Sequence, residues 1–322
     1  MRDSLREAIR HNVQVYCSEA AFRERLLRAL SRPGYALDPE GPCRAGALTL
    51  EVCRAISGPP DAAVIQGAAA VELYMQAAYM FDAVADGETG FGKGASAGEE
   101  LAMAIAIMAC GSAAACQAVT TSGSGDISPF LRFQAHCIGS CAGQLLDASF
   151  EKRGNVSSDE ALHMTSLKAG SLGRLAAGFG ASLATRDQST VLLFEDFGFN
   201  LFTYLQLVDD LRDACPCQDP PEDLTRGKKT VPLAFFRNWV AEQPAAADVI
   251  ILAREWEVSG SAVRERFEAS GAALFTALIA ETFLNRAKKG LVDLRPKVGT
   301  VGNLERLLIP LEVTPEEVAA LP

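Results

Sequence analysis

Apolar residues recur three or four positions apart along almost the whole 322-residue chain, and alanine is abundant. Strand-like alternation of β-branched residues is scarce, and clusters of Gly, Ser and Pro separate the periodic stretches. The pattern predicts helices over about residues 3–30, 44–57, 61–86, 97–119, 127–151, 158–185, 190–215, 230–241, 245–257, 260–290 and 301–311. We therefore expect an all-α helical bundle, with residues 1–322 forming a single domain.

The composition excludes several classes of function. A formal net charge of −10 argues against a nucleic-acid-binding surface. No apolar run of about 18–20 residues is free of charge or glycine, so we expect no membrane span. The charged N-terminus MRDSLREAIRHN is unlike a signal peptide, and the nine cysteines form no disulfide framework or zinc spacing. We expect a cytoplasmic protein with reduced thiols.

Three carboxylates lie inside the apolar, helix-like stretch QLVDDLRD, residues 206–213. Asp209 and Asp213 are four residues apart and would project from one helix face, with Asp210 beside them. A lone run of this kind is commonly a solvated acidic face. The alternative is a Mg²⁺ site, because Mg²⁺ is held by one or two carboxylates together with phosphates and water.

Other segments favour the metal site. Asp82 and Asp86 repeat the four-residue spacing at the end of a long apolar helix. Lys168 lies in LKAGSL, and Lys228 lies in the basic loop RGKKTVP. Acidic helix ends combined with lysines suit a diphosphate bridged by Mg²⁺. In an apolar bundle, the expected substrate has a charged head and a hydrocarbon tail.

Four motifs resemble those of the trans-isoprenyl diphosphate synthase family: GQLLDAS (143–149), EALHMTSLKAGSL (160–172), FGFNLFTYLQLVDDLRD (197–213) and GKKTVP (227–232). The resemblance covers roughly residues 35–310. It implies an all-α isoprenoid-synthase-type bundle with a central active-site cavity, usually homodimeric. It also implies Mg²⁺ between two aspartate-rich helices and ionisation of an allylic prenyl diphosphate.

The resemblance also assigns residue roles. The main Mg²⁺ ligands would be Asp82, Asp86 and Asp209, with Asp210 and Asp213 supporting the metal site, partly through water. Lys168 and Lys228 would grip the allylic diphosphate, and Gln206 would lie near the reacting cation.

The departures from the family pattern fall mostly on the site for isopentenyl diphosphate. Its GKxxRP segment reads GPCRAG over 41–46, its histidine reads Met75, and its Arg-Arg pair reads Phe91-Gly92. Each charged contact to a diphosphate contributes about 1.5–3 kcal/mol, so losing about four should abolish useful affinity. We expect no condensation with isopentenyl diphosphate. Ala83 and Ala169 also replace an aspartate and a threonine, and Ala83 weakens the first metal motif.

Several residues are candidates for contact with the hydrocarbon tail of the substrate. Ala77 and Ala78, five and four residues before Asp82, leave room for a prenyl tail of C15 or longer, although close helix packing explains them equally well. Phe81 and Met75 would line an apolar cavity, or would be ordinary core residues.

Three functions therefore remain open. The first is cyclisation of the prenyl cation to a terpene, which the apolar replacements favour slightly. The second is transfer of the prenyl group to an acceptor other than isopentenyl diphosphate. The third is a non-catalytic partner subunit of a prenyl diphosphate synthase.

Overall fold

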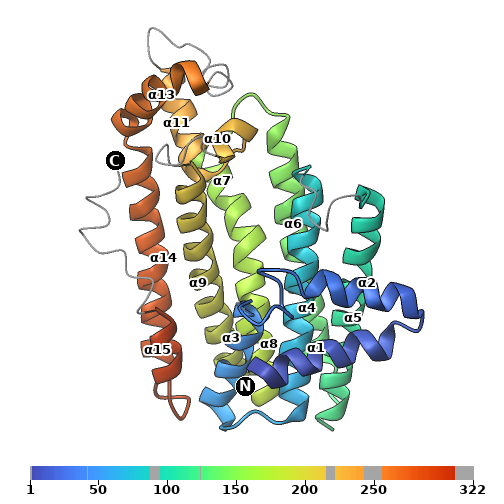
Figure 1. The fold of residues 1–322 in the computed structure, drawn as a ribbon. Coiled ribbons are helices and arrows are strands. Elements are labelled where there is room, and N and C mark those ends of the chain that lie inside the picture. The colour runs from blue at the N-terminus through green and yellow to red at the C-terminus, as the bar shows by residue number, and fades with distance from the viewer. Residues whose placement is uncertain are drawn as a thin grey trace. The chain divides into compact units, whose positions relative to one another are not determined.

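The protein is described by a computed structural model that covers residues 2–41, 43–87, 95–123, 125–214, 222–242 and 256–308. Its elements in chain order are α1 (Arg2–Tyr16), α2 (Ala20–Leu30), α3 (Arg44–Ser57), α4 (Ala62–Ala85), α5 (Ala97–Thr121), α6 (Ser128–Glu151), α7 (Ser158–Thr165), the π-helical turn η1 (Ser166–Gly170), α8 (Ser171–Ala184), α9 (Gln188–Ala214), α10 (Glu222–Arg226), α11 (Val231–Ala241), α13 (Trp256–Ser270), α14 (Ala272–Leu294) and α15 (Gly302–Leu308) (Figure 1). Within these ranges there is no strand, and the predicted all-α class is confirmed.

Two of the predicted helices are wrong because each is broken in the structure, and a third, over 158–185, continues through the π-helical turn η1 between α7 and α8. The helix expected over 3–30 breaks at residues 17–19, where Glu19 caps α2 by accepting hydrogen bonds from the backbone of Ala21 and Phe22. The helix expected over 260–290 breaks at Gly271, whose φ of +72° leaves the right-handed helical region. Most of the helix predicted over 245–257 lies outside the described residues.

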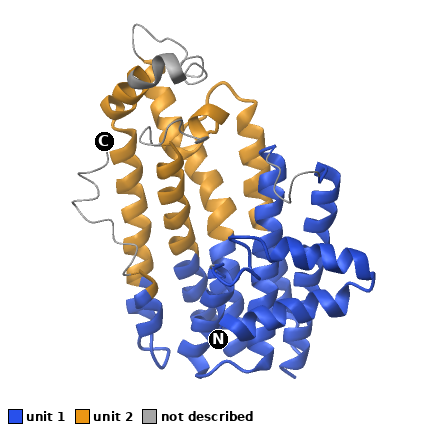
Figure 2. Cartoon of the chain, in the orientation of Figure 1, with its two compact units in different colours: residues 1–138, 172–198, 290–306 blue, residues 139–171, 199–289, 307–322 orange. Residues whose placement is uncertain are grey.

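The chain divides into two compact units (Figure 2). Unit 1 comprises residues 1–138, 172–198 and 290–306, and unit 2 comprises residues 139–171, 199–289 and 307–322. The expectation that residues 1–322 form a single domain stays a prediction.

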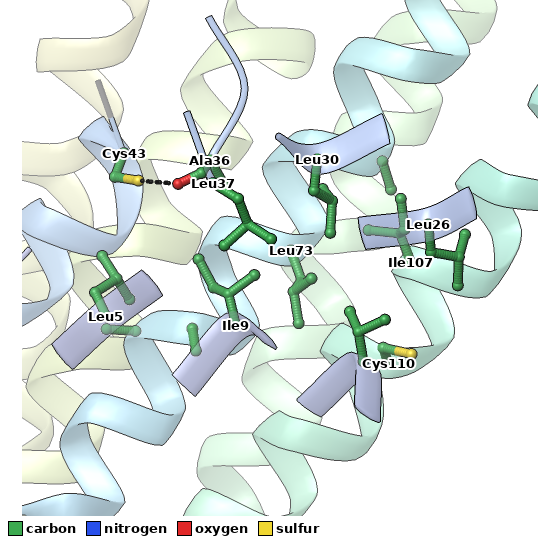
Figure 3. Packing of buried hydrophobic residues seen from close by; sticks show 14 of the residues in the cluster. Leu5, Ile9, Leu26, Leu30, Ala36, Leu37, Cys43, Leu73, Ile107 and Cys110 are labelled. Atoms are coloured by element: carbon green, nitrogen blue, oxygen red, sulfur yellow. Dashed lines mark hydrogen bonds between the residues drawn. The ribbon is translucent and has the colours of Figure 1, made fainter. Parts of the chain in front are cut away.

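The core of unit 1 is built from the apolar faces of its helices. In Figure 3, leucine and isoleucine side chains of α1, α2, α4 and α5 point toward one another. The labelled residues Leu5, Ile9, Leu26, Leu73 and Ile107 are almost fully buried. Burial of such a side chain contributes about 1.5–3 kcal/mol, so the period-3.6 pattern explains why these helices pack together.

A smaller core in unit 2 supports the basic loop at 227–230. Phe236 of α11 packs edge-on against Phe267 of α13, with ring centroids 5.2 Å apart. Leu224 of α10 and Leu233 of α11 belong to the same buried cluster. The elements on both sides of the loop are therefore anchored in one apolar cluster.

By length and composition alone, α5 and α9 are long and apolar enough to cross a membrane, and the bent pair 262–270 and 272–294 would add a third candidate. Half of the apolar window in each of α5 and α9 is buried inside the protein. Both helices also contain glycine, at Gly111 and Gly198, as expected from the sequence. The absence of a membrane span stays a prediction.

Candidate functional site

The acidic run at the end of α9 has two different faces. Asp209 is half-exposed and pairs with Arg212 across 3.1 Å, and Asp213 follows one turn later. Asp210 is 5% exposed and points into unit 2, where Gln206 donates a 2.7 Å hydrogen bond to its Oδ1. The expectation that Asp209 and Asp213 project from one helix face, with Asp210 beside them, stays a prediction; Asp210 is buried whereas Asp209 is half-exposed, because successive helical residues are rotated by about 100°.

The buried carboxyl of Asp210 is an electrostatically costly group. Burial raises the pKa of its carboxyl well above the usual range, with the hydrogen bond from Gln206 opposing that rise. Nearby Asp223 and Asp147 raise the pKa further, whereas Lys168 lowers it. Among the described residues, no donor reaches its Oδ2. A proton or a cation at this oxygen would relieve the cost.

The carboxylates suit Mg²⁺ in their chemistry. Over the part of the chain that the structure describes, no three Asp, Glu, His or Cys side chains converge as a metal site. Mg²⁺ does not require three protein ligands, since it is usually held by one or two carboxylates with phosphates and water. Asp209 and Asp213 lie one turn apart on α9, and no described residue donates to the Oδ2 of Asp210, so the residues present fit this ion.

Lys168 lies on the π-helical turn η1, a rare conformation that occurs often at functional sites. Its Nζ is 2.8 Å from Oδ2 of Asp147 on α6, and both side chains are largely buried. This contact depends on Gly143, one turn before Asp147. A Cβ at Gly143 would lie 2.2 Å from the backbone nitrogen of Lys168, so only glycine allows the two helices to approach this closely.

The basic loop holds two buried ammonium groups in succession. Nζ of Lys228 lies 3.5 Å from Oε1 of Glu151 at the end of α6. Nζ of Lys229 donates a 3.0 Å hydrogen bond to the carbonyl of Gly227, whose φ is +77°. Burial lowers the pKa of Lys229, and the nearby Arg237 lowers it further, whereas Glu151 raises it. The loop is therefore a region of concentrated positive charge.

Several buried oxygens in unit 2 lack hydrogen-bond donors or acceptors among the described residues. They are Thr165 Oγ1, Thr203 Oγ1, Asp210 Oδ2 and Thr230 Oγ1. All four belong to unit 2, as do Lys168, Gln206 and Lys228. Because folded proteins satisfy nearly all buried polar groups, each of these oxygens is a candidate to receive a partner from a polar ligand.

The first aspartate pair lies in unit 1. Asp82 is partly buried in the last turn of α4, and Asp86 is the C-cap residue just beyond it. Met75 and Ala77 are buried, and Ala78 and Phe81 are partly buried. The prediction that this pair shares metal ions with the α9 carboxylates concerns both units and stays a prediction. Phe91 and Gly92 lie outside the described residues.

Four charged residues at the unit 2 site were not predicted from the sequence: Asp147, Glu151, Lys229 and Arg237. The sequence contained a spacing signal for two of them. Asp147 and Glu151 have the same four-residue spacing as the aspartate pairs on which the metal-site prediction rests.

The chain is similar in sequence to known proteins. The family model described as polyprenyl synthetase matches residues 29–259. A geranylfarnesyl diphosphate synthase of Natronomonas pharaonis is 30% identical over 137 residues, which cover 39% of this chain and 40% of that protein. A geranylgeranyl diphosphate synthase of Mycobacterium tuberculosis is 33% identical over 112 residues, covering 33% and 32%. The matched segments span less than half of these curated relatives.

Solved structures share the fold over nearly the full length. The crystal structure of a geranylgeranyl pyrophosphate synthase from Lactobacillus brevis matches with a TM-score of 0.78 at 18% identity, covering 96% of this chain and 94% of that chain. A polyprenyl synthetase from Streptomyces coelicolor matches with a TM-score of 0.75 at 22% identity, covering 91% of each. At these identities the likeness establishes the all-α fold.

Proposed function

We propose, from the premise that this chain belongs to the polyprenyl synthetase family, that it is an enzyme that ionises an allylic prenyl diphosphate. The observation that carries this proposal is the set of buried oxygens in unit 2 that have no partner among the described residues, in the same unit as two largely buried lysines. A diphosphate offers several acceptor oxygens and a strong negative charge. It therefore matches the hydroxyl and ammonium donors of such a site.

Each polar group has a defined task in this reaction. The ammonium groups of Lys168 and Lys228 bind and neutralise the diphosphate, and Asp209 and Asp213 would hold Mg²⁺ with support from Asp210. Bound Mg²⁺ supplies Lewis-acid stabilisation of the leaving diphosphate. The bond between C1 and oxygen breaks heterolytically, the electron pair leaves with the diphosphate, and an allylic cation remains beside Gln206.

For the fate of this cation, the proposal is cyclisation to a terpene. Two of the positions expected to bind a second diphosphate lie among the described residues of unit 1: Met75 stands at the family's histidine position and is buried, and Arg44 is exposed. Arg6 is the buried cation near this segment, and it donates to the carbonyls of Ala36, Pro39 and Gly41. An allylic carbocation that meets no external acceptor reacts with the substrate's own double bonds when water is excluded.

Chain elongation and prenyl transfer are the alternatives. The named relatives are geranylgeranyl and geranylfarnesyl diphosphate synthases, which favours elongation. For the tail length, Ala77 belongs to the packed core cluster of unit 1, and Phe81 packs against the same cluster. Ala77, Ala78 and Phe81 stay the candidates for a pocket that accepts C15 or longer tails, with core packing as the alternative.

The decisive experiment incubates the purified protein and Mg²⁺ with C10, C15, C20 and C25 allylic diphosphates, with and without isopentenyl diphosphate. We expect diphosphate release and terpene hydrocarbons or alcohols without any acceptor. Longer prenyl diphosphates formed only with isopentenyl diphosphate would establish elongation. Release that requires a cell-extract fraction would indicate another acceptor. No turnover under any condition would contradict the proposal and favour a non-catalytic subunit.

We also propose that the protein forms a homodimer through α5 and α6. These helices are linked by a 2.9 Å hydrogen bond from Gln134 to Ser112, and they expose large apolar side chains at Ile105, Leu131 and Ile138. Several exposed large apolar side chains on two linked helices favour a protein interaction surface.

Ile138, which is 69% exposed, provides the test of this interface. The substitution Ile138→Glu should shift the native mass from dimer to monomer without lowering the melting temperature, because a charge would be buried in the interface but solvated on a monomer. Light scattering coupled to gel filtration measures the mass. Leu192→Glu on α9, at a residue that is 51% exposed, is the matched control and should leave the dimer intact.

A further inference from the structure

The last two turns of α6 carry a pair of carboxylates that face both of the lysines assigned to the diphosphate. Asp147 and Glu151 are four residues apart and therefore lie on one helix face. Asp147 pairs with Lys168, and Glu151 pairs with Lys228. Each lysine thus has an acidic partner from the same helix.

The two ion pairs differ in the distance between nitrogen and oxygen and in the exposure of their side chains. The Asp147–Lys168 pair is separated by 2.8 Å, and the Asp147 side chain is 7% exposed. The Glu151–Lys228 pair is separated by 3.5 Å, and the Glu151 side chain is 43% exposed whereas that of Lys228 is 9% exposed. Asp147 is therefore a fixed partner of Lys168. The Glu151 carboxylate is more exposed, so water can replace Lys228 as its partner at a small cost in free energy.

The positive charges around Glu151 explain why a carboxylate is needed at this position. Lys228 and Lys229 are consecutive and buried, and Arg237 of α11 lies close enough to lower the pKa of Lys229. Glu151 acts in the opposite direction and raises that pKa. Its negative charge compensates part of the repulsion among these cations.

We infer that Glu151 is a positioning residue, a displaceable counter-ion that holds Lys228 in the empty site and yields it to a diphosphate oxygen. This inference rests on the proposed function. The carboxylate competes with the ligand for one ammonium group and also repels the ligand's negative charge. Glu151 therefore weakens diphosphate binding and speeds diphosphate release, acting on affinity through Lys228 rather than on bond cleavage.

The test compares the affinity of inorganic diphosphate, with Mg²⁺ present, for the full chain and its variants by calorimetry. Glu151→Gln keeps the size of the side chain and removes its charge. We expect about fivefold tighter binding, the scale of one partly exposed ion pair. KM for the allylic diphosphate should fall in step, whereas single-turnover ionisation should not change. In the double variant Glu151→Gln/Lys228→Met, the gain caused by Glu151→Gln should disappear.

Glu160→Gln is the matched control. Glu160 has the same 43% side-chain exposure and pairs with Arg153 at 2.8 Å, so the substitution makes the same charge change within unit 2. Glutamine at this third helical position preserves the capping box with Ser157, which maintains α7. Diphosphate affinity should be unchanged in this control.

Three results would overturn the inference. The first is an unchanged or weaker affinity in Glu151→Gln while wild type binds diphosphate, which leaves the proposed function intact. The second is the same gain in Glu160→Gln, which would indicate a general charge effect. The third is neither binding nor turnover in wild type, which removes the proposed function as well. Should Glu151→Gln fold poorly, Glu151→Asp keeps the charge but shortens its reach, and an affinity equal to that of wild type would also overturn the inference.

Discussion

Asp209→Ala is expected to reduce Mg²⁺-dependent diphosphate release from an allylic diphosphate about a thousandfold. Metal stabilisation of a leaving group contributes several kcal/mol, and each 1.36 kcal/mol changes the rate about tenfold. The loss should appear in kcat and should not be restored by saturating substrate. Release of diphosphate measured over a Mg²⁺ titration is the readout, because a weakened site also requires more metal.

The fold should survive this substitution. Asp209 has a half-exposed side chain, and its partner Arg212 is 69% exposed, so their ion pair contributes only about 0–1 kcal/mol to stability. Asp196→Asn on the same helix is the control, since Asp196 is exposed and pairs with Arg174 at 3.4 Å. Equal activity of Asp209→Ala and wild type would remove the metal assignment.

Gly143→Ala is expected to cause the largest loss of stability among the substitutions considered. Its new Cβ would lie 2.2 Å from the backbone nitrogen and 2.5 Å from Cα of Lys168. Backbone atoms cannot rotate away, so α6 and η1 must separate. Overpacking of this kind costs about 3 kcal/mol or more, which exceeds the roughly 1 kcal/mol that alanine gains over glycine inside a helix.

Urea denaturation measures this loss as a change in the free energy of unfolding. Separation of the two helices would also break the Asp147–Lys168 pair, so diphosphate affinity should fall in the fraction that folds. Gly139→Ala, one turn earlier on α6, is the control, because its Cβ would meet the hydroxyl of Ser171, which can rotate. Similar stabilities for both variants would contradict the close approach at Gly143.

The helices were predictable because burial of one face imposes a period of 3.6 on the apolar residues. The wrong helix predictions lie at two positions where the structure interrupts a predicted helix. Residues 17–19 and Gly271 interrupt periodic stretches without an obvious loop composition, and the breaks depend on the side-chain cap of Glu19 and the positive φ of Gly271. Caps and dihedral angles are local geometry that hydrophobic spacing does not encode.

The candidate site was predictable to the level of residue types. Spacing on one helix identified Asp209 and Asp213 as neighbours, and the motifs around Lys168 and Lys228 marked the basic groups. The burial of Asp210 was not predictable. It depends on which face of α9 packs inward, and that is decided by helices far away in the chain.

The sequence by itself determined an all-α fold and a set of acids and lysines suited to a metal and a diphosphate, because period and residue chemistry are properties of short segments. The tertiary structure decided which of these acidic and basic side chains contact one another. Asp147 lies 21 residues before Lys168, and Glu151 lies 77 residues before Lys228, yet both pairs are in contact. Such pairing depends on the approach of separate helices, which Gly143 permits by the absence of a side chain.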